Sequence, residues 1–377
     1  LSVLFKGANA VLKILHTSDL QLDAPFHFLG AKGKNHRQQL RRTFEKITKL
    51  AMSSSYDLLI IAGDLFNDNS PSQETVDYVK YHLENLTIPV VILPGNHDCY
   101  DSQSVYRRYS FPQNIKIIQE RKSYLPFPDL DLTVAGSPIL SPHDNQSLIR
   151  GLSRPTNTRW YIIVAHGSLQ IPGRFENHAR AIGLEEIASS NADYIALGDW
   201  HNFADYSQGS VRAFYSGAPE PTSLTQEGAG KVASITLSDQ GVEVESLPIG
   251  TISTRSISLN ISGSSARQII TRIRQEASPN LILKVTLNGM KRLGEPIDLE
   301  MDTDLSSYFY YLQIKDDSVT ALDNISATDY PETHVIGQYI RLLQDKIVSA
   351  KSDDERRIAE QAMQLGVLLL QGKEVLK

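Results

Sequence analysis

A short apolar run followed at once by residue types that bind metals occurs five times in this chain, and this recurrence most constrains the fold. The run Val90–Leu93 leads through Pro94 into Gly95-Asn96-His97-Asp98. The other four runs precede Asp19 with Gln21, Asp64, His166, and Asp199 with His201. Because Pro and Gly mark turns, each polar group is expected just beyond the end of a strand.

The five polar groups share one position relative to their strands, which predicts one shared site. Ligands collect beyond the carboxyl ends of strands in an open layered sheet. A lone strand-end Asp usually caps a helix and a lone His is usually a core residue, but five such groups favour a common crevice. Carboxylate, amide and imidazole together suit a pair of divalent cations such as Mn²⁺, Fe²⁺ or Zn²⁺. With one cysteine, Cys99, a thiolate zinc site is not expected.

Strands and helices alternate in the first third of the chain. Apolar runs at 12–16, 57–62 and 89–93 predict strands, and apolar residues at helical spacing predict helices at about 32–50 and 72–86. Strands that are apolar throughout are typical of a sheet covered on both faces. The pattern predicts a mixed α/β (α+β) fold.

The rest of the chain is less regular. Segment 115–137 predicts exposed, antiparallel strands, 160–164 and 192–197 predict buried strands, and a helix is expected from Ile182. Segments 211–216 and 231–237 are expected to close the sheet. After Gly250, strands at 251–260, 281–287, 297–301 and 308–314 with a helix at 265–277 indicate a small β-α-β-β module. Two amphipathic helices follow Pro331, and Ser352 caps the second.

These changes of pattern divide the 377 residues into four expected segments. Residues 1–10 resemble a protease-site remnant or an upstream segment, with a native start near Val11. Residues 11–250 form the main domain, 251–325 a small second domain, and 326–377 the helical pair. The single cysteine favours a reducing, cytoplasmic location. No apolar run approaches the roughly 20 residues that span a bilayer, so no membrane association is expected.

One helical segment carries many basic residues although the chain as a whole has a net charge of −6. The negative net charge argues against a basic surface that coats nucleic acid, but it allows a local patch. The simplest interpretation is a solvated helix face without a binding role. The alternatives are a dimer surface or contact with the phosphates of nucleic acid. The candidates for DNA contact are Lys32, Lys34, Arg37, Arg41 and Arg42.

The motifs together resemble a known superfamily. Their order, Asp-x-Gln, Gly-Asp-x-x-Asn, Gly-Asn-His-Asp, Ala-His-Gly and Gly-Asp-Trp-His, is similar to that of the calcineurin-like metallophosphoesterases. The strings His16-Thr17-Ser18-Asp19-Leu20-Gln21-Leu22-Asp23 and Gly63-Asp64-Leu65-Phe66 resemble the SbcD-type DNA repair exonuclease subunits. This resemblance covers 12 to about 247 and implies a four-layer α/β/β/α sandwich. The later segments resemble, in position only, the cap domain and the segment that holds an SMC-like ATPase.

The resemblance implies roles for individual residues. One metal would be held by Asp19, Gln21, Asp64 and His201, and the second by Asp64, Asn96, His166 and Asp199. His97 would be the catalytic imidazole, oriented by Asp98. Gln21 and Asp199 stand where the superfamily generally has His. The neutral oxygen of Gln21 binds metal less strongly than imidazole, which predicts a weaker first site, and Asp199 adds a negative charge at the second site. The second site should favour hard ions, so Mn²⁺ or Mg²⁺ gains over Zn²⁺.

The function implied by the resemblance is a Mn²⁺-dependent DNA nuclease that uses a two-metal mechanism. It would be an exonuclease, with endonuclease action on single strands, and would act in DNA repair with an SMC-like ATPase as a homodimer. Two alternatives remain open at this point. One is a phosphodiesterase or phosphatase of the same superfamily that acts on a small molecule or protein. The other is a non-catalytic scaffold that binds DNA ends.

Overall fold

The computed structural model describes residues 11–170, 181–292, 304–321, 330–331 and 333–372. The chain divides into two units, Leu1–Arg255 with Asn280–Ile282, and Ser256–Pro279 with Leu283–Lys377. The expected N-terminal segment 1–10 and the expected strand at 297–301 lie outside the described residues. None of the described helices has the length and apolar character that crossing a bilayer requires.

The first sheet of the first unit is built around the three strands that the apolar runs predict. Its strand order is β14-β13-β1-β2-β3-β4. β1 to β4 pair in parallel, and β13 pairs antiparallel with β1. The strand bounds are Leu12–Thr17 (β1), Leu58–Ala62 (β2), Val90–Leu93 (β3), Ile115–Ile117 (β4), Lys231–Ser238 (β13) and Gly241–Pro248 (β14).

The second sheet has the order β11-β12-β10-β7-β6-β5. β6, β7, β10 and β12 run in parallel, and the two edge strands pair antiparallel with their neighbours. The strand bounds are Ser123–Phe127 (β5), Leu132–Gly136 (β6), Trp160–His166 (β7), Tyr194–Gly198 (β10), Ala204–Asp205 (β11) and Arg212–Tyr215 (β12).

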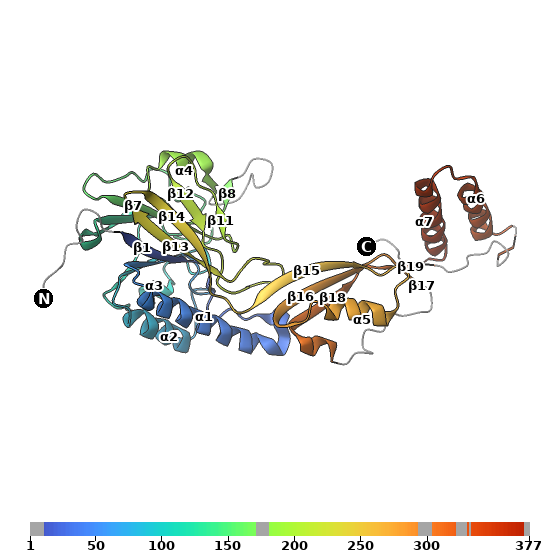
Figure 1. The fold of residues 1–377 in the computed structure, drawn as a ribbon, viewed down its shortest axis with the longest axis horizontal. Helices are drawn as coiled ribbons and strands as arrows, with labels where there is room; N and C mark the ends of the chain where they lie inside the picture. The colour runs from blue at the N-terminus through green and yellow to red at the C-terminus, as the bar shows by residue number, and fades with distance from the viewer. Residues whose placement is uncertain (1–10, 171–180, 293–303, 322–329, 332, 373–377) are drawn as a thin grey trace. The chain divides into compact units, whose positions relative to one another are not determined.

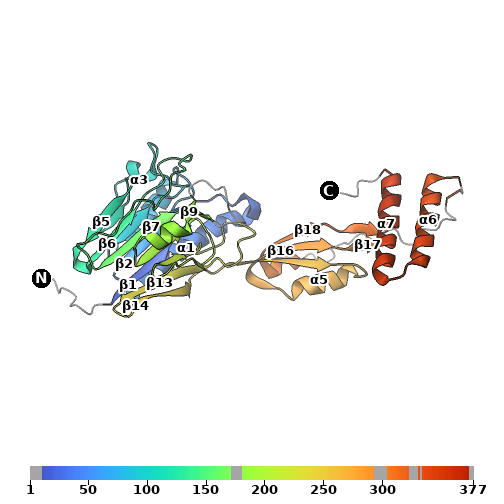
Figure 2. The ribbon, with the colours of Figure 1, turned by 90° about the horizontal axis from the view of Figure 1, so that it is seen from above.

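The two sheets stack on one apolar core, and helices cover their outer faces (Figure 1, Figure 2). The core between the sheets includes Ile14, Ile60, Ile162 and Ala196, all fully buried. Helices α1 (Gly33–Ser53) and α2 (Gln73–Glu84) bury apolar faces, and the second sheet has a further core cluster that includes Ile187 of α4 (Leu184–Ser189). The predicted four-layer α/β/β/α sandwich is confirmed.

Three expectations about the middle of the chain are wrong in detail. β4 is parallel and joins the first sheet, and β6 is fully buried and parallel to β7, so segment 115–137 is neither wholly antiparallel nor exposed. Ile182–Gly183 is a strand, β9, that pairs with β8 (Leu169–Gln170), and the helix starts only at Leu184. β12 and β13 lie in two different sheets, and each is one strand in from the edge. In each case pairing with a distant strand decided the structure, and local pattern does not encode it.

In the described part of the chain, the remaining short elements are α3 (Val105–Arg108) and three 3₁₀ helices. The latter span His27–Lys32 (η1), Pro128–Leu130 (η2) and Leu305–Tyr308 (η3). In the second unit the sheet order is β15-β16-β18, with a separate pair β17-β19. The bounds are Ser253–Asn260 (β15), Ala266–Arg274 (α5), Ser278–Asn288 (β16), Met290–Arg292 (β17), Phe309–Asp316 (β18), Val319–Ala321 (β19), Val335–Ser349 (α6) and Asp353–Leu370 (α7).

Strand β1 carries a buried histidine in the core between the sheets. His16 is fully buried, and its Nδ1 lies 2.9 Å from the Tyr194 hydroxyl. Among the described residues, none gives its Nε2 a hydrogen bond within ordinary distance. Burial lowers the pKa of His16 from 6.5 to about 3, because the charged ring loses its hydration. The ring is therefore neutral in the folded protein at ordinary pH.

Replacing His16 by Gln is expected to make unfolding less sensitive to acid. The pKa of His16 is lower in the folded protein than in the unfolded chain. The free energy of unfolding is therefore highest above pH 6.5 and decreases as the pH falls toward the pKa of the folded state. Between pH 6.5 and 5 the wild type should lose up to about 2 kcal/mol more than the variant. Urea unfolding of metal-free protein, followed by the fluorescence of Trp160 and Trp200, measures this difference. Tyr194→Phe keeps the imidazole and should keep the wild-type slope, whereas equal slopes in all three proteins would contradict the assignment.

Candidate metal centre

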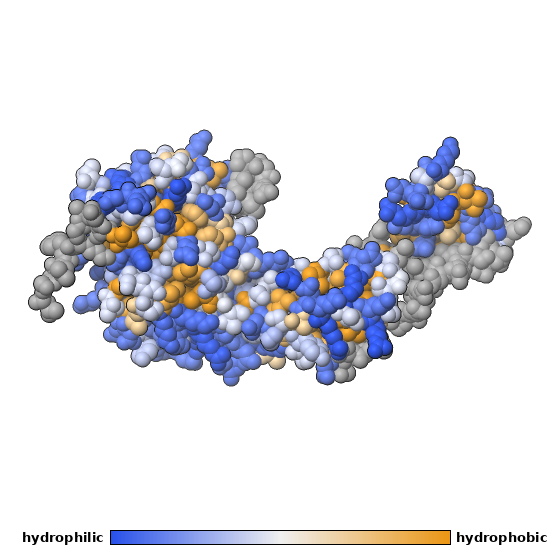
Figure 3. All heavy atoms as spheres, in the orientation of Figure 1, coloured by the Kyte–Doolittle hydropathy of each residue, from blue (hydrophilic) through white to orange (hydrophobic). Residues whose placement is uncertain are grey.

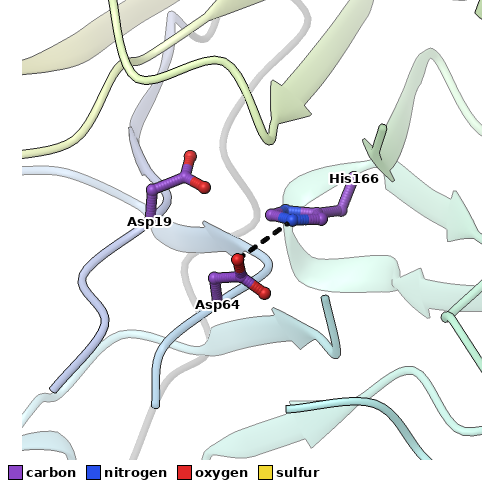
Figure 4. Close-up of side chains that lie close together, drawn as sticks. All are labelled: Asp19, Asp64 and His166. Atoms are coloured by element: carbon purple, nitrogen blue, oxygen red, sulfur yellow. Dashed lines mark ion pairs between the residues drawn. The ribbon is translucent and has the colours of Figure 1, made fainter. Parts of the chain in front are cut away.

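The polar groups that follow five strands meet at one edge of the stacked sheets. Asp19 follows β1, Asp64 follows β2, Asn96 follows β3, Asp199 follows β10, and His166 ends β7. Ligand atoms of Asp19, Asp64 and His166 all lie within 4.8 Å of one another, and the three side chains are buried (Figure 4). Asp19 and Asp64 thus come from the first sheet, and His166 comes from the second.

The backbone at these positions is held in a conformation that residues other than glycine rarely adopt. The φ angle is 53° at Asp19, 43° at Gln21, 53° at Asp64 and 96° at Asp199. The loops support one another, since the Gln21 amide donates to the Asp64 carbonyl at 2.9 Å. Left-handed φ angles outside glycine cost energy and cluster at functional sites. Four of the seven predicted ligands are therefore placed at energetic cost, which favours a shared functional role.

Glycines next to the ligands let the strands approach closely. A Cβ on Gly95 would lie 2.1 Å from Asp64 Oδ1, and a Cβ on Gly198 would lie 1.9 Å from the Ala62 carbonyl oxygen. A Cβ on Gly63, which has a φ of 93°, would lie 2.0 Å from His166 Nδ1. The glycines of the Gly-Asp and Gly-Asn-His-Asp motifs are thus required by the packing of the ligand groups.

His166 is oriented by a backbone carbonyl. Its Nδ1 lies 2.8 Å from the Ala62 carbonyl oxygen. Its Nε2 faces three acceptors, Asn96 Oδ1 at 2.9 Å, Asp64 Oδ2 at 3.3 Å and Asp199 Oδ1 at 3.9 Å. Because the carbonyl fixes the far side of the ring, Nε2 is the nitrogen available to a metal ion.

His201 contacts the cluster through Asp19. Its Nε2 lies 3.4 Å from Asp19 Oδ1. Asp19 also accepts a hydrogen bond from the Ser18 hydroxyl at 2.6 Å and one from the Asp199 amide. The Nδ1 of His201 contacts the Gln226 amide nitrogen and lies 3.3 Å from the Thr222 hydroxyl. The structure therefore brings His201 to Asp19, as the sequence predicts.

The cluster contains several negatively charged carboxylates that a bound cation would stabilise. Among the described ion pairs, none joins Asp19, Asp64 or Asp199 to a Lys or Arg. Burial alone would lower the pKa of His166, but Asp64, Asp19 and Asp199 raise that pKa well above its usual value. Buried carboxylates without a positive partner are unfavourable unless a cation binds them. The oxygen and nitrogen donors present therefore fit divalent metal ions.

The expectation that Asp98 orients His97 is wrong. Asp98 is fully buried, and it accepts hydrogen bonds from the Gly95 amide at 2.7 Å, the Phe66 amide at 3.1 Å and the Tyr106 hydroxyl at 2.6 Å. Its role is to hold the loop between β3 and α3. His97 is exposed, and its Nδ1 lies instead 2.7 Å from the Asn67 carbonyl oxygen. A backbone carbonyl carries no sequence signal, so this contact could not be predicted.

The basic candidates on and beside α1 have unequal surroundings. Arg41 pairs with Glu74 and, at 3.7 Å, with Asp23, and Arg37 donates to the Pro25 carbonyl at 2.9 Å. Lys34 and Arg42 are exposed, and Lys32 is half-buried. His36 of the same helix contacts the Pro221 carbonyl at 2.7 Å, directly before the loop that contacts His201. The start of α1 therefore lies near the rim of the cluster.

Sequence reasoning missed a buried carboxylate in the loop after β12. Glu220 is 1% exposed and accepts hydrogen bonds from Gln39, Thr43 and the backbone amides of Thr251 and Ile252. It joins α1 to the loop after β12 and to the end of the first unit. No apolar run precedes Glu220 directly, so the strand-end pattern carries no signal for it.

Ser168 and Gln226 were also missed. The Ser168 hydroxyl donates to Asp199 Oδ2, and Gln226 contacts His201. Both are polar loop residues whose types are common everywhere in proteins. Only the geometry shows that each contacts a predicted ligand.

Comparison with known proteins gives a family match and several relatives. The model of the calcineurin-like phosphoesterase family matches residues 12–203. The chain is 24% identical over 288 residues to the DNA double-strand break repair protein Mre11 of Methanosarcina mazei, covering 74% of this chain and 45% of that one. It is 24% identical over 344 residues to the Mre11 of Saccharolobus solfataricus, covering 84% and 86%. It is 27% identical over 280 residues to the SbcD component of the nuclease SbcCD of Escherichia coli K12, covering 63% and 68%.

Proposed function

Because this chain belongs to the calcineurin-like phosphoesterase family, we propose that it is a metal-dependent DNA nuclease acting in DNA repair. The observation that carries the proposal is the buried group of Asp19, Asp64 and His166, with the exposed His97 beside it. DNA as the substrate is supported by relatives named as DNA double-strand break repair proteins and as a nuclease component. The chain spans about half the length of the first of these relatives, so whole-protein activity is part of the proposal.

Two divalent ions would be held by the residues at the strand ends. Asp64 would be shared between them, and the other ligands would be Asp19, Gln21 and His201 for one ion and Asn96, His166 and Asp199 for the other. When bound, such ions supply Lewis-acid polarisation of the phosphoryl group and activation of the attacking water. Mn²⁺ is the proposed ion, because the set combines hard carboxylate and amide oxygens with only two imidazoles.

His97 would act on the substrate from the rim of the cluster. Its Nδ1 lies 2.7 Å from the Asn67 carbonyl oxygen, which only accepts hydrogen bonds, so Nε2 is the nitrogen left to act on the substrate. A protonated ring donates from Nε2 to a phosphoryl oxygen or to the leaving oxygen. The His97 backbone amide donates to Asp64 Oδ1 at 3.0 Å, which couples the position of the loop to the shared ligand.

DNA would be bound through its phosphates by local basic patches. The chain as a whole does not attract DNA, because its net charge is −6. Lys34 and Arg42 are the favoured contacts of α1, and Lys32 and Arg37 lie on either side of Lys34 in the sequence. Arg41, whose guanidinium already pairs with Glu74, is the weakest of the five basic candidates. In the second unit, we propose that the module of β15, α5, β16 and β18 acts as a cap domain that contacts DNA.

The helices α6 and α7 are proposed to hold an SMC-like ATPase partner. They pack on each other through Ile336, Ile340 and Val367, and they leave other large apolar side chains exposed (Figure 3). Val348 is 84% exposed and Ile358 is 62% exposed, which is costly for a surface without a partner. A homodimer would form through α1 and α2, where Met52 and Tyr81 are exposed.

The test of the proposed function is nuclease activity of the purified full chain with Mn²⁺ on linear duplex and single-stranded DNA. We expect cleavage of both. We expect His97→Ala to lower the rate by roughly 10²- to 10³-fold while bound Mn²⁺ stays unchanged, because His97 is exposed and is not a proposed ligand. The exposed His143 has no described contact with the cluster, so His143→Ala should retain wild-type activity.

Two outcomes would redirect the proposal. Hydrolysis of a chromogenic diester without cleavage of DNA would favour a phosphodiesterase that acts on a small molecule or protein. DNA binding without metal-dependent cleavage would favour a scaffold at DNA ends. Equal activity in His97→Ala and the wild type would remove His97 from the reaction.

A further inference from the structure

A short segment beyond β2 lies against the loop that follows β3. We call residues 66–69 the strap, because hydrogen bonds tie this segment to the loops beside it. The Phe66 amide donates to Asp98 Oδ2 at 3.1 Å, and the Asn67 amide donates to the Leu22 carbonyl at 2.9 Å. The strap thus joins the loop after β1 to the loop after β3.

The strap also holds the ring of His97. The Nδ1 of His97 lies 2.7 Å from the Asn67 carbonyl oxygen, and the His97 side chain is exposed. An exposed side chain without a fixed contact exchanges between rotamers in picoseconds to nanoseconds. Because a reacting group must be held in one geometry to be effective, the contact with Asn67 matters for what the ring can do. The position of the ring therefore depends on the position of the strap.

Asn69 anchors the far end of the strap. Its Nδ2 donates to the Cys99 carbonyl at 2.9 Å, and its Oδ1 accepts from the Val105 amide at 3.0 Å. Cys99 follows His97 closely in the chain, and Val105 is the first residue of α3. The nitrogen of the Asn69 amide faces an acceptor and its oxygen faces a donor, so both halves are satisfied. One side chain thus ties the strap to the chain that follows His97.

We propose that Asn69 is a positioning residue for His97, which acts by fixing the strap whose Asn67 carbonyl holds the ring. The described hydrogen-bond partners of Asn69 are Cys99 and residues of α3, none of which is a proposed metal ligand. Its effect on the reaction therefore passes through His97 and leaves the metal centre unchanged. This inference rests on the proposed function, in which His97 acts on the substrate.

Steady-state kinetics of the full chain with Mn²⁺, on a chromogenic diester and on linear DNA, test the proposal. We expect Asn69→Ala to lower kcat by roughly 10- to 100-fold, because a displaced group loses most of the advantage of its position. KM and the affinity for Mn²⁺ should stay within about threefold of the wild type, since the ligands are untouched. A rise in KM at constant kcat, or Mn²⁺ binding weakened by about tenfold or more, would overturn the proposal.

A double-mutant cycle separates positioning of His97 from general damage to the site. If Asn69 acts through His97, the variant with both His97→Ala and Asn69→Ala should have a kcat within about threefold of His97→Ala alone. Independent effects would instead multiply. The double variant would then fall below His97→Ala by a further factor of roughly 10 to 100, and that result would contradict the positioning role.

Asn114→Ala is the matched control for the loss of an asparagine side chain. Asn114 is half-buried like Asn69, and it also bonds two backbone groups, the Leu83 and Leu86 carbonyls at 2.9 and 3.2 Å. Both single variants should unfold at lower urea concentrations than the wild type, but Asn114→Ala should keep kcat within about threefold of it. An equal fall of kcat in both variants would show a general effect of lost stability and would rule out a specific role of Asn69.

The order of the His97 ring can be measured without substrate or metal. In ¹³C relaxation of metal-free protein with labelled histidine, the order parameter of the His97 ring should fall in Asn69→Ala and keep its wild-type value in Asn114→Ala. An unchanged order parameter in Asn69→Ala would overturn the inference. Wild-type cleavage by His97→Ala, or no cleavage by the wild type, would overturn the proposed function, and the order parameter then decides separately whether Asn69 positions the ring.

Discussion

Asp64→Asn is expected to abolish metal-dependent hydrolysis, with a loss on the order of a thousandfold or more. Asp64 is the ligand that both proposed sites share, and its Oδ2 lies 3.3 Å from His166 Nε2. Asparagine keeps an oxygen for the His97 amide, which donates to Asp64 Oδ1 in the wild type, but it removes the charge that binds the ions. Mn²⁺ titration should show loss of binding at both proposed sites, and the rate on a chromogenic diester should fall with it.

The same substitution is expected to leave the metal-free fold intact. Burial and the neighbouring Asp64 together raise the pKa of Asp98 to about 6, which shows that these carboxylates repel one another. Without metal, Asp64→Asn relieves this repulsion but also removes the carboxylate that raises the pKa of His166, so its melting temperature should stay within about 5 °C of the wild type. Asp68→Asn, in the exposed turn that follows, keeps its acceptor for the Ser70 amide and should retain wild-type rates. Two bound ions in Asp64→Asn, or more than a tenth of the wild-type rate, would refute the shared role.

Gly198→Ala is expected to destabilise the first unit by about 3 kcal/mol or more. The added methyl carbon would lie 1.9 Å from the Ala62 carbonyl oxygen, 2.6 Å from His166 Nδ1 and 3.0 Å from Ser18 Cβ. It would thus intrude on the hydrogen bond that orients His166. Urea unfolding followed by tryptophan fluorescence measures the loss, and Mn²⁺ titration should show loss of the site that includes His166.

The matched control is Gly183→Ala. A Cβ on Gly183 would meet its nearest atom, Glu186 Cγ, at 3.6 Å, which is ordinary contact, and the φ angle there is −76°. Its cost should stay near 1 kcal/mol, the typical penalty of Ala at a helix N-cap. If Gly198→Ala unfolds within about 1 kcal/mol of the wild type, the close packing of β10 against β2 is not what holds His166 in place.

The parts of the fold that the sequence predicts are those with a local cause. β2 and β3 are apolar in every residue because both faces are covered, and the structure shows every residue in them buried. A helix is predicted to start at Ser72, and the Ser72 side chain accepts from the Thr75 amide as the N-cap of α2. These features depend on neighbours within a few residues.

The parts that the sequence does not predict depend on distant partners. β4 looks exposed in isolation, yet it extends the first sheet because Ile115 to Ile117 pair with β3. The site shows the same division. Asp19, Asp64, Asn96 and His166 follow from the strand-end pattern, whereas the carbonyls of Ala62 and Asn67, which orient two imidazoles, have no side chain to reveal them.

The pairing of β1 with β13 has a consequence for how the protein is made. Leu12 lies opposite Leu237, and the Asp199 amide bonds to Asp19 across 180 residues of chain. A chain still being synthesised holds Asp19 and Asp64 early but lacks His201 and the strand that completes its first sheet. Such long-range contacts form late. A metal centre assembled in this way is incomplete until strands of both sheets have formed, so a chain interrupted before Asp199 lacks part of the ligand set.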